Sequence, residues 1–502
     1  MNMITQESLS DYSLKIAGLY PKVNDTTYVH KMPDRNYIHG DYDGEEVRFI
    51  FQSRTMNTIN DDALSLLELC DGTRTTEEII RAVNQHYNSG DEAVDFSQDV
   101  ISFLYISTEI FKNVTIQERI AETPAVLQIT GAKDKYFPQH FAMEVTTKCN
   151  LTCKHCYRSS SPSITENEIP LDKVLSTLQE MYDVGGRFVE ITGGEPFIHS
   201  GIKEILKYAA DKFNFVAILT NGTMVTPQIM DFLEPYKDKV IWSISLDSCK
   251  EEYHDQFRGL KGAFKRTTNT IKQLTDRGFT VRTSMTMTLD NLDHFIDTLN
   301  FVKDDLKSTF FGYSYVLNYG RGKEIPFHPN PAQVQEMLAI DKYTEKEELS
   351  FFVNKVSAER SNQLKKTMIN CGAGWRTIAI GPNGNVRPCV MMDESFITLG
   401  NIYDNKINEI MDEQITPFFH NIRWPLEAEC TGCGNEQYCK WCTYRAMIIN
   451  VERVRQGIGL CKWAKNNRVD QFFDFERLTE TGAPTSSLDA LHCGDMNCSV
   501  FD

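Results

Sequence analysis

The spacing of hydrophobic and polar positions changes along the chain and divides it into several blocks. Between residues 139 and 345, short apolar runs of strand length alternate with longer segments whose apolar residues recur every three or four positions. The apolar runs predict six strands, FAMEVT, RFVEITG, FVAILT, VIWSISL, FTVRTSMTM and FFGYSYV, with helical patterns such as LDKVLSTLQEMYDV between them. Six successive βα units predict an α/β fold, in which a parallel sheet with right-handed crossovers curves into a partial (β/α)6, TIM-like barrel.

Residues 1–110 have a different order of elements, which predicts a small α+β domain of winged-helix type. The alternating segments NYIHGDY and EEVRFIF join through Asp43-Gly44, a strong hairpin signal. A helix is predicted through LSLLELC. A second helix begins at Thr75, where Glu78 completes a capping box before an apolar run, and a third helix follows.

The remaining segments lack a regular period. We interpret residues 111–138 as a linker. In residues 346–475, regular periodicity fades and cysteine, glycine and proline recur, so we expect that apolar burial alone cannot hold this segment together and that bound metal organises it. Residues 476–502 read as a flexible tail that contains Cys493 and Cys498.

Composition narrows the classes of function. A formal net charge of −17 argues against a nucleic-acid partner, because such a partner requires a basic face. The sequence shows neither a secretory signal nor an apolar run near the roughly 18 residues that cross a membrane, so we expect a cytoplasmic protein without a membrane partner. In that reducing compartment, the fourteen cysteines favour metal binding over a disulfide framework.

Three cysteines, Cys149, Cys153 and Cys156, follow the first predicted strand on one short loop. Three thiolates can hold a four-iron cluster while leaving one iron without a protein ligand, whereas a closed electron-transfer cluster normally takes four. Sites in parallel barrels gather at the carboxyl ends of strands, so we expect this loop at the barrel mouth. Considered alone, the triplet is also compatible with a zinc site.

The segment CNLTCKHCY, followed by TGGEP in the second strand unit, resembles the radical S-adenosylmethionine (SAM) superfamily. The resemblance implies that the free iron is chelated by the methionine moiety of SAM, and that the reduced cluster cleaves a carbon–sulfur bond to release a 5′-deoxyadenosyl radical. It also implies an electron donor such as flavodoxin or ferredoxin.

The resemblance further implies SAM-binding residues at strand ends. These are Gly193, Gly194, Glu195, Ser245, Asp247 and Arg258. The two glycines allow a ligand close to the backbone, and Glu195 matches the acceptor of the SAM ammonium. Ser245 and Asp247 match contacts to the ribose region, and Arg258 matches the partner of the methionine carboxylate. Each polar residue could instead be an ordinary strand-end residue or part of a surface ion pair, and the sequence identifies no catalytic base.

Seven further cysteines form a second constellation that resembles the SPASM extension of radical SAM enzymes. The resemblance implies two auxiliary four-iron clusters, and so three [4Fe-4S] clusters in all. Residue matching gives one cluster four ligands and the other three: Cys430, Cys433, Cys439 and Cys461 for the first, and Cys371, Cys389 and Cys442 for the second. Two residues separate Cys439 from Cys442 where the family usually has three. A pair of zinc sites is the alternative.

A cluster with three ligands would have an open iron, where a substrate cysteine thiolate could bind. The tail leaves the number of ligands of this cluster undecided. Cys493 or Cys498 could supply the missing ligand, the two could form a redox pair, or they could have no role.

The amino-terminal segment LLELCDGTRTTEEII resembles PqqD-like domains, which recognise the leader of a ribosomally made precursor peptide by adding it as a strand. Any winged-helix module would show similar elements. With the other resemblances, it implies a maturase of such peptides (RiPPs) that forms thioether crosslinks of the sactipeptide or ranthipeptide type. Carbon–carbon or carbon–oxygen crosslinking and formylglycine-type oxidation are the alternatives within this chemistry. A non-catalytic iron–sulfur or zinc scaffold that binds peptides is the alternative of another class.

Overall fold

The computed structural model shows two compact units, residues 1–136 and 137–502. The residues that it describes are 6–39, 57–88, 94–165, 168–317, 319–326, 330–350, 352–353, 370–392, 394, 396–411, 415–431, 433, 439, 442–471 and 473. No helix in these ranges is both long enough and apolar enough to cross a membrane.

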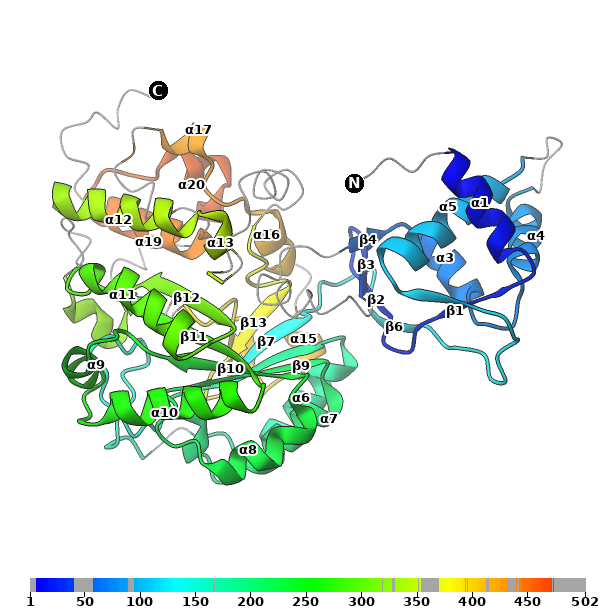
Figure 1. Ribbon diagram of the computed structural model, residues 1–502. Coiled ribbons are helices and arrows are strands. Elements are labelled where there is room, and N and C mark those ends of the chain that lie inside the picture. The colour runs from blue at the N-terminus through cyan, green and yellow to red at the C-terminus, as the bar shows by residue number, and fades with distance from the viewer. Residues whose placement is uncertain are drawn as a thin grey trace. The chain divides into compact units, whose positions relative to one another are not determined.

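The amino-terminal unit packs helices against small sheets (Figure 1). Its elements are α1 (Gln6–Ile16), β1 (Tyr20–Val23), β2 (Tyr28–Lys31), β3 (Asn36–His39), β4 (Asn57–Ile59), α3 (Asp61–Leu69), α4 (Thr76–Tyr87), α5 (Ser97–Tyr105), a π-helical turn (Ile106–Ile110), β5 (Val114–Gln117) and β6 (Gln128–Gly131). One sheet has the strand order β4-β3-β2-β6, and β1 pairs with β5. Leu67, Ile79 and Leu104 bring α3, α4 and α5 together in the core of the unit.

The predicted helices of this unit are confirmed, including the start of α4. Thr75 Oγ1 accepts a hydrogen bond from the Glu78 amide, and the Glu78 carboxylate accepts one from the Thr75 amide. Helix α1 and strand β1 were not predicted. The Asp43-Gly44 hairpin turn lies outside the described residues.

Residues 111–138 differ from the linker that the sequence suggested. They carry β5, which pairs antiparallel with β1, and β6, which pairs parallel with β2. Both partner strands lie about a hundred residues earlier in the chain, and pairing over that separation leaves no local pattern in the sequence. The boundary between the compact units therefore falls after Tyr136.

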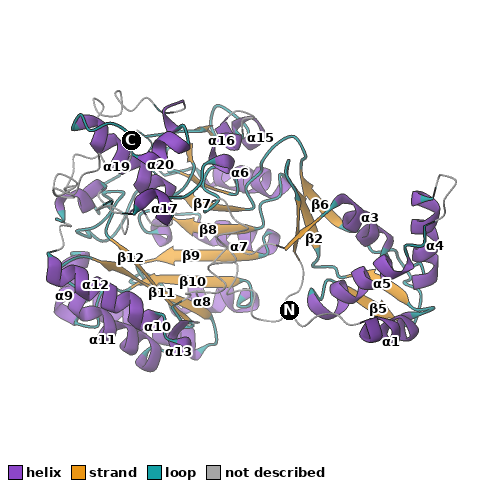
Figure 2. Ribbon diagram, turned by 90° about the horizontal axis from the view of Figure 1, so that it is seen from above, coloured by secondary structure: helices purple, strands orange, loops and turns teal. Residues whose placement is uncertain are grey.

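The second unit begins with the predicted barrel. Its strands are β7 (His140–Glu144), β8 (Phe188–Thr192), β9 (Phe215–Thr220), β10 (Val240–Ser245), β11 (Thr280–Met287) and β12 (Phe310–Tyr315). All six predicted strands are confirmed, and they lie side by side, parallel and in chain order (Figure 2). Val240, Ile241 and Trp242 of β10 are all buried, as expected for a parallel strand covered on both faces.

Helices connect these strands. They are α6 (Leu171–Asp183), α7 (Ile202–Lys212), α8 (Pro227–Leu233), α9 (Glu251–Arg258), α10 (Ala263–Asp276) and α11 (Phe295–Asn300), with a π-helical turn at Phe301–Asp305 and 3-10 turns at Pro196–Ile198, Glu234–Tyr236, Leu292–His294 and Gly320–Glu324.

The segment after the barrel extends the same sheet. Its elements are α12 (Pro331–Thr344), α13 (Glu347–Ser350), β13 (Thr377–Ile380), β14 (Asn385–Arg387), β15 (Gly400–Asn401), α15 (Ile407–Ile410), α16 (Ile415–Asn421), α17 (Glu427–Cys430), α19 (Thr443–Arg455), α20 (Lys462–Asn466) and a 3-10 turn (Val469–Gln471). Strand β13 pairs parallel with β7, and β14 and β15 follow antiparallel, so the sheet is open and has nine described strands. These strands have two to four residues, too few for a period to be visible in the sequence. The chain is thus less irregular here than predicted.

Candidate active site and metal centres

The triplet Cys149, Cys153 and Cys156 lies on the loop that leaves the carboxyl end of β7, as predicted. Cys149 and Cys153 are buried, each 7% exposed, and pack with Leu151. Arg321, which follows the last barrel strand in the chain, makes two hydrogen bonds to this loop. Its Nε donates to the Cys153 carbonyl at 2.8 Å, and its amide donates to the Cys156 carbonyl at 3.0 Å. The loop is therefore held in shape by protein contacts.

The glycine pair after β8 packs directly against this loop. The Gly194 amide donates to the Thr146 carbonyl at 2.7 Å. A Cβ on Gly193, whose φ is +142°, would lie 2.4 Å from the Thr146 oxygen, and a Cβ on Gly194 would lie 2.1 Å from the Lys148 oxygen. The sequence led us to expect close approach of a ligand; in the structure, the backbone that approaches these glycines is that of the cysteine loop.

Glu195 is fully buried beside the triplet. Its carboxylate accepts hydrogen bonds from Thr220 Oγ1 at 2.7 Å, from the Asn221 amide at 2.9 Å and from the Phe197 amide at 3.3 Å. Burial raises the pKa of Glu195 to about 7, and these hydrogen bonds oppose the shift. A carboxylate in this position would be stabilised by a cationic group such as an ammonium.

Asp247 and Arg258 are brought together as a buried ion pair. Arg258 Nε donates to Asp247 Oδ2 at 2.6 Å, and a terminal guanidinium nitrogen lies 3.8 Å from Cys153 Sγ. Burial alone would raise the pKa of Asp247, but Arg258 and nearby groups outweigh it and lower the pKa. Burial raises the pKa of the Cys153 thiol, and Arg258 opposes that shift. Ser245 ends β10 and is partly exposed. Arg258 thus supplies positive charge at the triplet.

Asn221 is a residue of the site that the sequence analysis missed. It follows β9 directly and is buried. Its Nδ2 donates to Asn150 Oδ1 at 2.9 Å and lies 4.0 Å from Cys149 Sγ, while its amide binds Glu195. The position itself was the available signal, since a polar residue at the carboxyl end of a barrel strand faces the mouth.

His155 lies inside the triplet but does not act as an accessible ligand in this structure. Its ring stacks on Phe257 with centroids 4.4 Å apart, and burial lowers its pKa to about 3.

The distal cysteines have neighbours among one another, with Cys442 near both Cys389 and Cys439, and their division into two ligand sets stays a prediction. Burial raises the pKa of the Cys389 thiol to about 12, and the neighbouring thiols of Cys442 and Cys371 add to the shift. Burial likewise raises the pKa of Cys439, with contributions first from Cys433 and then from Cys461, Cys430 and Cys442. We call Cys371, Cys389 and Cys442 the three-thiol group. We call Cys430, Cys433, Cys439 and Cys461 the four-thiol group. Buried thiols with raised pKa values ionise readily only when a metal or another cation compensates their charge.

Local structure supports both groups. Cys442 is the N-cap of α19, and its sulfur accepts from the Arg445 amide at 3.5 Å, at the helix end that favours negative charge. Cys461 Sγ accepts from Asn450 Nδ2 at 3.2 Å. Beside Cys371, the side chain of Asn370 donates to the carbonyl of Phe419 at 2.7 Å. Within the described ranges, no three His, Cys, Asp or Glu side chains converge closely enough to hold a single metal ion. Cys493 and Cys498 lie outside those ranges.

Comparison with known proteins agrees with this geometry. A model of the radical SAM superfamily matches residues 143–302, and a model of the iron–sulfur cluster-binding SPASM domain matches residues 371–434. The chain is 32% identical over 465 residues to the antilisterial bacteriocin subtilosin biosynthesis protein AlbA of Bacillus subtilis (strain 168), covering 91% of this chain and 98% of AlbA.

Two further proteins are similar over a smaller share or at lower identity. The sporulation killing factor maturation protein SkfB of the same organism is 28% identical over 284 residues, which is 57% of this chain and 67% of SkfB. The crystal structure of Streptococcus suis SuiB bound to precursor peptide SuiA matches with a TM-score of 0.56 at 13% identity, covering 80% of this chain and 91% of SuiB. The last comparison shows a shared fold.

Proposed function

The chain belongs to the family of radical SAM enzymes with a SPASM domain that includes AlbA, and from that premise we propose that it forms thioether crosslinks in a ribosomally made precursor peptide. The observation that supports the proposal is the proximity of Cys371 and Cys442 to Cys389, the three residues that residue matching assigns to a cluster with three protein ligands. A group of three leaves room for one thiolate from outside the protein, and a peptide cysteine is the natural candidate.

The enzyme uses SAM and several [4Fe-4S] clusters, and the residues present fit them. Three thiols on one loop, two of them buried and one partly buried, suit an anionic cluster, and Arg258 lies 3.8 Å from one of them. We assign the cluster that binds SAM to Cys149, Cys153 and Cys156, and one auxiliary cluster to each distal group. When bound and reduced, this cluster with SAM supplies a 5′-deoxyadenosyl radical that removes a hydrogen atom from a substrate carbon.

The protein's own residues then have binding and orienting roles. The buried Glu195 carboxylate is placed to accept from the SAM ammonium, and Arg258 is placed to pair with its carboxylate, with Asp247 fixing the guanidinium. The Gly193–Gly194 turn holds the cysteine loop in place, and we assign Ser245, at the carboxyl end of β10, to the ribose region of SAM. Burial of these groups keeps water from the reacting atoms.

The amino-terminal unit supports recognition of a leader peptide as in PqqD-like domains. In its four-stranded sheet, β6 covers the β2 edge, so β4 is the edge strand at the other side of the described sheet. A peptide strand added at β4 would gain main-chain hydrogen bonds, and alternate side chains would confer specificity. We propose this edge for the leader, and a flavodoxin or ferredoxin as the electron donor.

The direct test is reaction of the anaerobically reconstituted, dithionite-reduced protein with a small cysteine-containing peptide encoded beside its gene. Formation of one thioether removes the thiol hydrogen and one carbon-bound hydrogen, so the peptide should lose two hydrogens and one alkylatable thiol per crosslink. If the peptide loses two hydrogens while its thiol can still be alkylated, the product is a carbon–carbon or carbon–oxygen crosslink, and the thioether proposal is wrong.

The triplet is tested separately. Cys153→Ala should abolish formation of 5′-deoxyadenosine while the auxiliary iron stays bound, as measured by iron content and chromatography. Cys249→Ala is the matched control, because Cys249 is partly buried and belongs to none of the three groups. Retained SAM cleavage in Cys153→Ala would refute the assignment.

A further inference from the structure

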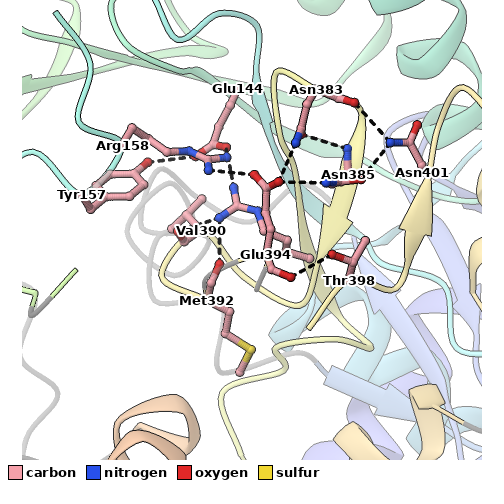
Figure 3. Close-up of polar contacts among 11 residues, drawn as sticks. Glu144, Tyr157, Arg158, Asn383, Asn385, Val390, Met392, Glu394, Thr398 and Asn401 are labelled. Carbon is pink, nitrogen blue, oxygen red and sulfur yellow. Dashed lines mark hydrogen bonds and ion pairs between the residues drawn. The ribbon is translucent and has the colours of Figure 1, made fainter. Parts of the chain in front are cut away.

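Four charged side chains that alternate in sign form a continuous chain beside the cysteine loop, in the order Arg387, Glu144, Arg158, Glu394 (Figure 3). Glu144 and Arg387 are fully buried, and Arg158 is nearly so. The two carboxylates balance the two guanidinium groups. A buried set of this kind is tolerated because each charge has an opposite partner.

Glu144 stands at the centre of this charge chain and is the last residue of β7. One carboxylate oxygen accepts from both Arg158 and Arg387, and the other accepts from the Tyr157 hydroxyl at 3.0 Å. Burial, reinforced by Glu144, raises the pKa of Tyr157, so the phenol stays a donor. Tyr157 and Arg158 follow Cys156 directly, and Glu144 therefore holds the end of the triplet loop.

Arg387 carries the charge chain into the SPASM segment. It ends β14, two residues before Cys389, and its second terminal nitrogen donates to the Met392 carbonyl at 2.8 Å and the Val390 carbonyl at 3.2 Å. One guanidinium thus contacts Glu144 and also closes the turn that presents Cys389, a member of the three-thiol group.

Glu394 makes a second connection to the same turn region. It accepts from Arg158 at 3.0 Å and from Asn385 Nδ2 at 2.8 Å, and Asn385 accepts in turn from Asn401 Nδ2 at 2.8 Å (Figure 3). Burial alone would raise the pKa of Glu394, but hydrogen bonds from Asn383, Asn385 and Arg158 lower it. Arg158 is therefore tied to the SPASM segment by two carboxylates.

From these contacts we propose that Glu144 is a positioning residue that fixes the triplet loop relative to the Cys389 turn, and so sets the separation of the SAM site from the three-thiol group. The proposal rests on the proposed function in that both loops hold clusters. Pairing of β7 with β13 aligns the two backbones. The triplet loop follows β7 and the Cys389 turn follows β14, and the charge chain adds a side-chain lock between the two.

Loosening this lock should separate two steps that the native enzyme couples. SAM cleavage requires the triplet loop and the residues assigned to SAM, whereas crosslink formation also requires the substrate thiol at the three-thiol group to lie within reach of the carbon radical. A misplaced Cys389 turn should therefore raise the amount of 5′-deoxyadenosine formed per crosslink.

The test compares Glu144→Gln and Glu394→Gln in the full-length, cluster-loaded protein. In Glu144→Gln, hydrogen–deuterium exchange of residues 383–401 should become at least about tenfold faster, because Arg158 and Arg387 lose their shared buried carboxylate. In Glu394→Gln the increase should be smaller. The ratio of 5′-deoxyadenosine to crosslinked peptide should rise in the same order. Glu190→Gln is the matched control: this barrel carboxylate contacts His140 at 3.2 Å, on β7.

The exchange measurement does not depend on the identity of the product, so it distinguishes failure of this inference from failure of the proposed function. Exchange in residues 383–401 that stays at the control level in both variants would overturn the positioning role. If Glu144→Gln does not fold, the milder Glu394→Gln decides, because Glu394 is half-buried and its loss leaves Glu144 with both arginines.

Discussion

At the scale of single residues, the site depends on close backbone packing more than on free polar groups. Gly193 and Gly194 are required because a Cβ on either would meet a carbonyl oxygen of the cysteine loop, and the Gly194 amide also donates to that loop. Glu195, Asp247 and Arg258 all have protein partners, so they are pre-oriented before any cofactor binds. Such pre-orientation lowers the entropy that binding must offset.

Gly194→Ala tests this packing. The added Cβ would meet the Lys148 oxygen at 2.1 Å, so the loop must shift, which we expect to lower stability by about 1–3 kcal/mol and to reduce iron bound by the triplet. Iron content and thermal unfolding are the measurements. Gly201→Ala is the control, because its Cβ would meet only the Leu171 side chain. Equal iron loss in both variants would contradict the packing argument.

Glu195→Gln tests the buried carboxylate through pH. The folded-state pKa of about 7 lies above the usual 4.5, so the folded protein binds more protons than the unfolded chain between these values, and its unfolding free energy falls as pH rises through this window. The shift corresponds to about 3 kcal/mol. In thermal unfolding, the unfolding free energy of the SAM-free wild type, relative to that of Glu195→Gln, should fall by this amount between pH 4.5 and 7. Above pH 7 the difference should stay constant. A difference independent of pH would contradict it. The variant should also bind SAM more weakly.

At the scale of elements, local signals decided where structure begins. Most barrel strands are short apolar runs because both of their faces are covered, and α4 begins where its capping box lies. Short elements such as β14 and β15 depend instead on neighbours that the sequence does not place beside them.

The capping box of α4 gives a prediction at this scale. Thr75→Ala removes the acceptor of the Glu78 amide and should cost about 1 kcal/mol, with faster hydrogen exchange in the first turn of α4. Thr226→Ala is the matched control, because Thr226 is the N-cap of α8 without a side-chain cap bond. Similar losses in the two variants would show that capping is not the cause.

At the scale of the whole molecule, we propose that recognition and chemistry belong to different units of the chain. The two compact units divide after Tyr136, and every cysteine of the three groups lies in the second unit. We expect the first unit to contribute to peptide affinity and the second to contain the chemistry.

Removal of residues 1–136 tests that division. The shortened protein should still form 5′-deoxyadenosine, but at limiting peptide concentration it should crosslink a leader-bearing peptide about tenfold more slowly, which corresponds to ~1.4 kcal/mol of lost binding. A peptide without its leader should react equally with both proteins. If the shortened protein crosslinks the leader-bearing peptide as fast as the full-length protein does, the first unit does not recognise the leader.

The sequence by itself determined the features that repeat or that depend on neighbours in the chain. These include the six barrel strands, the helix starts with caps, and the cysteine loop at the end of the first strand. Short-range spacing controls all of these, because hydrogen bonding and burial of one element follow from its own pattern.

Only the tertiary structure decided what depends on distant partners. The pairing of β5 with β1, the placement of β13 beside β7, and the role of Asn221 each join residues far apart in the chain. The same is true of Glu144, which reads in the sequence as the last polar residue of a strand and becomes the centre of a charge chain when Arg387 arrives 243 residues later. Buried charges require partners, and the fold alone determines which partners come within reach.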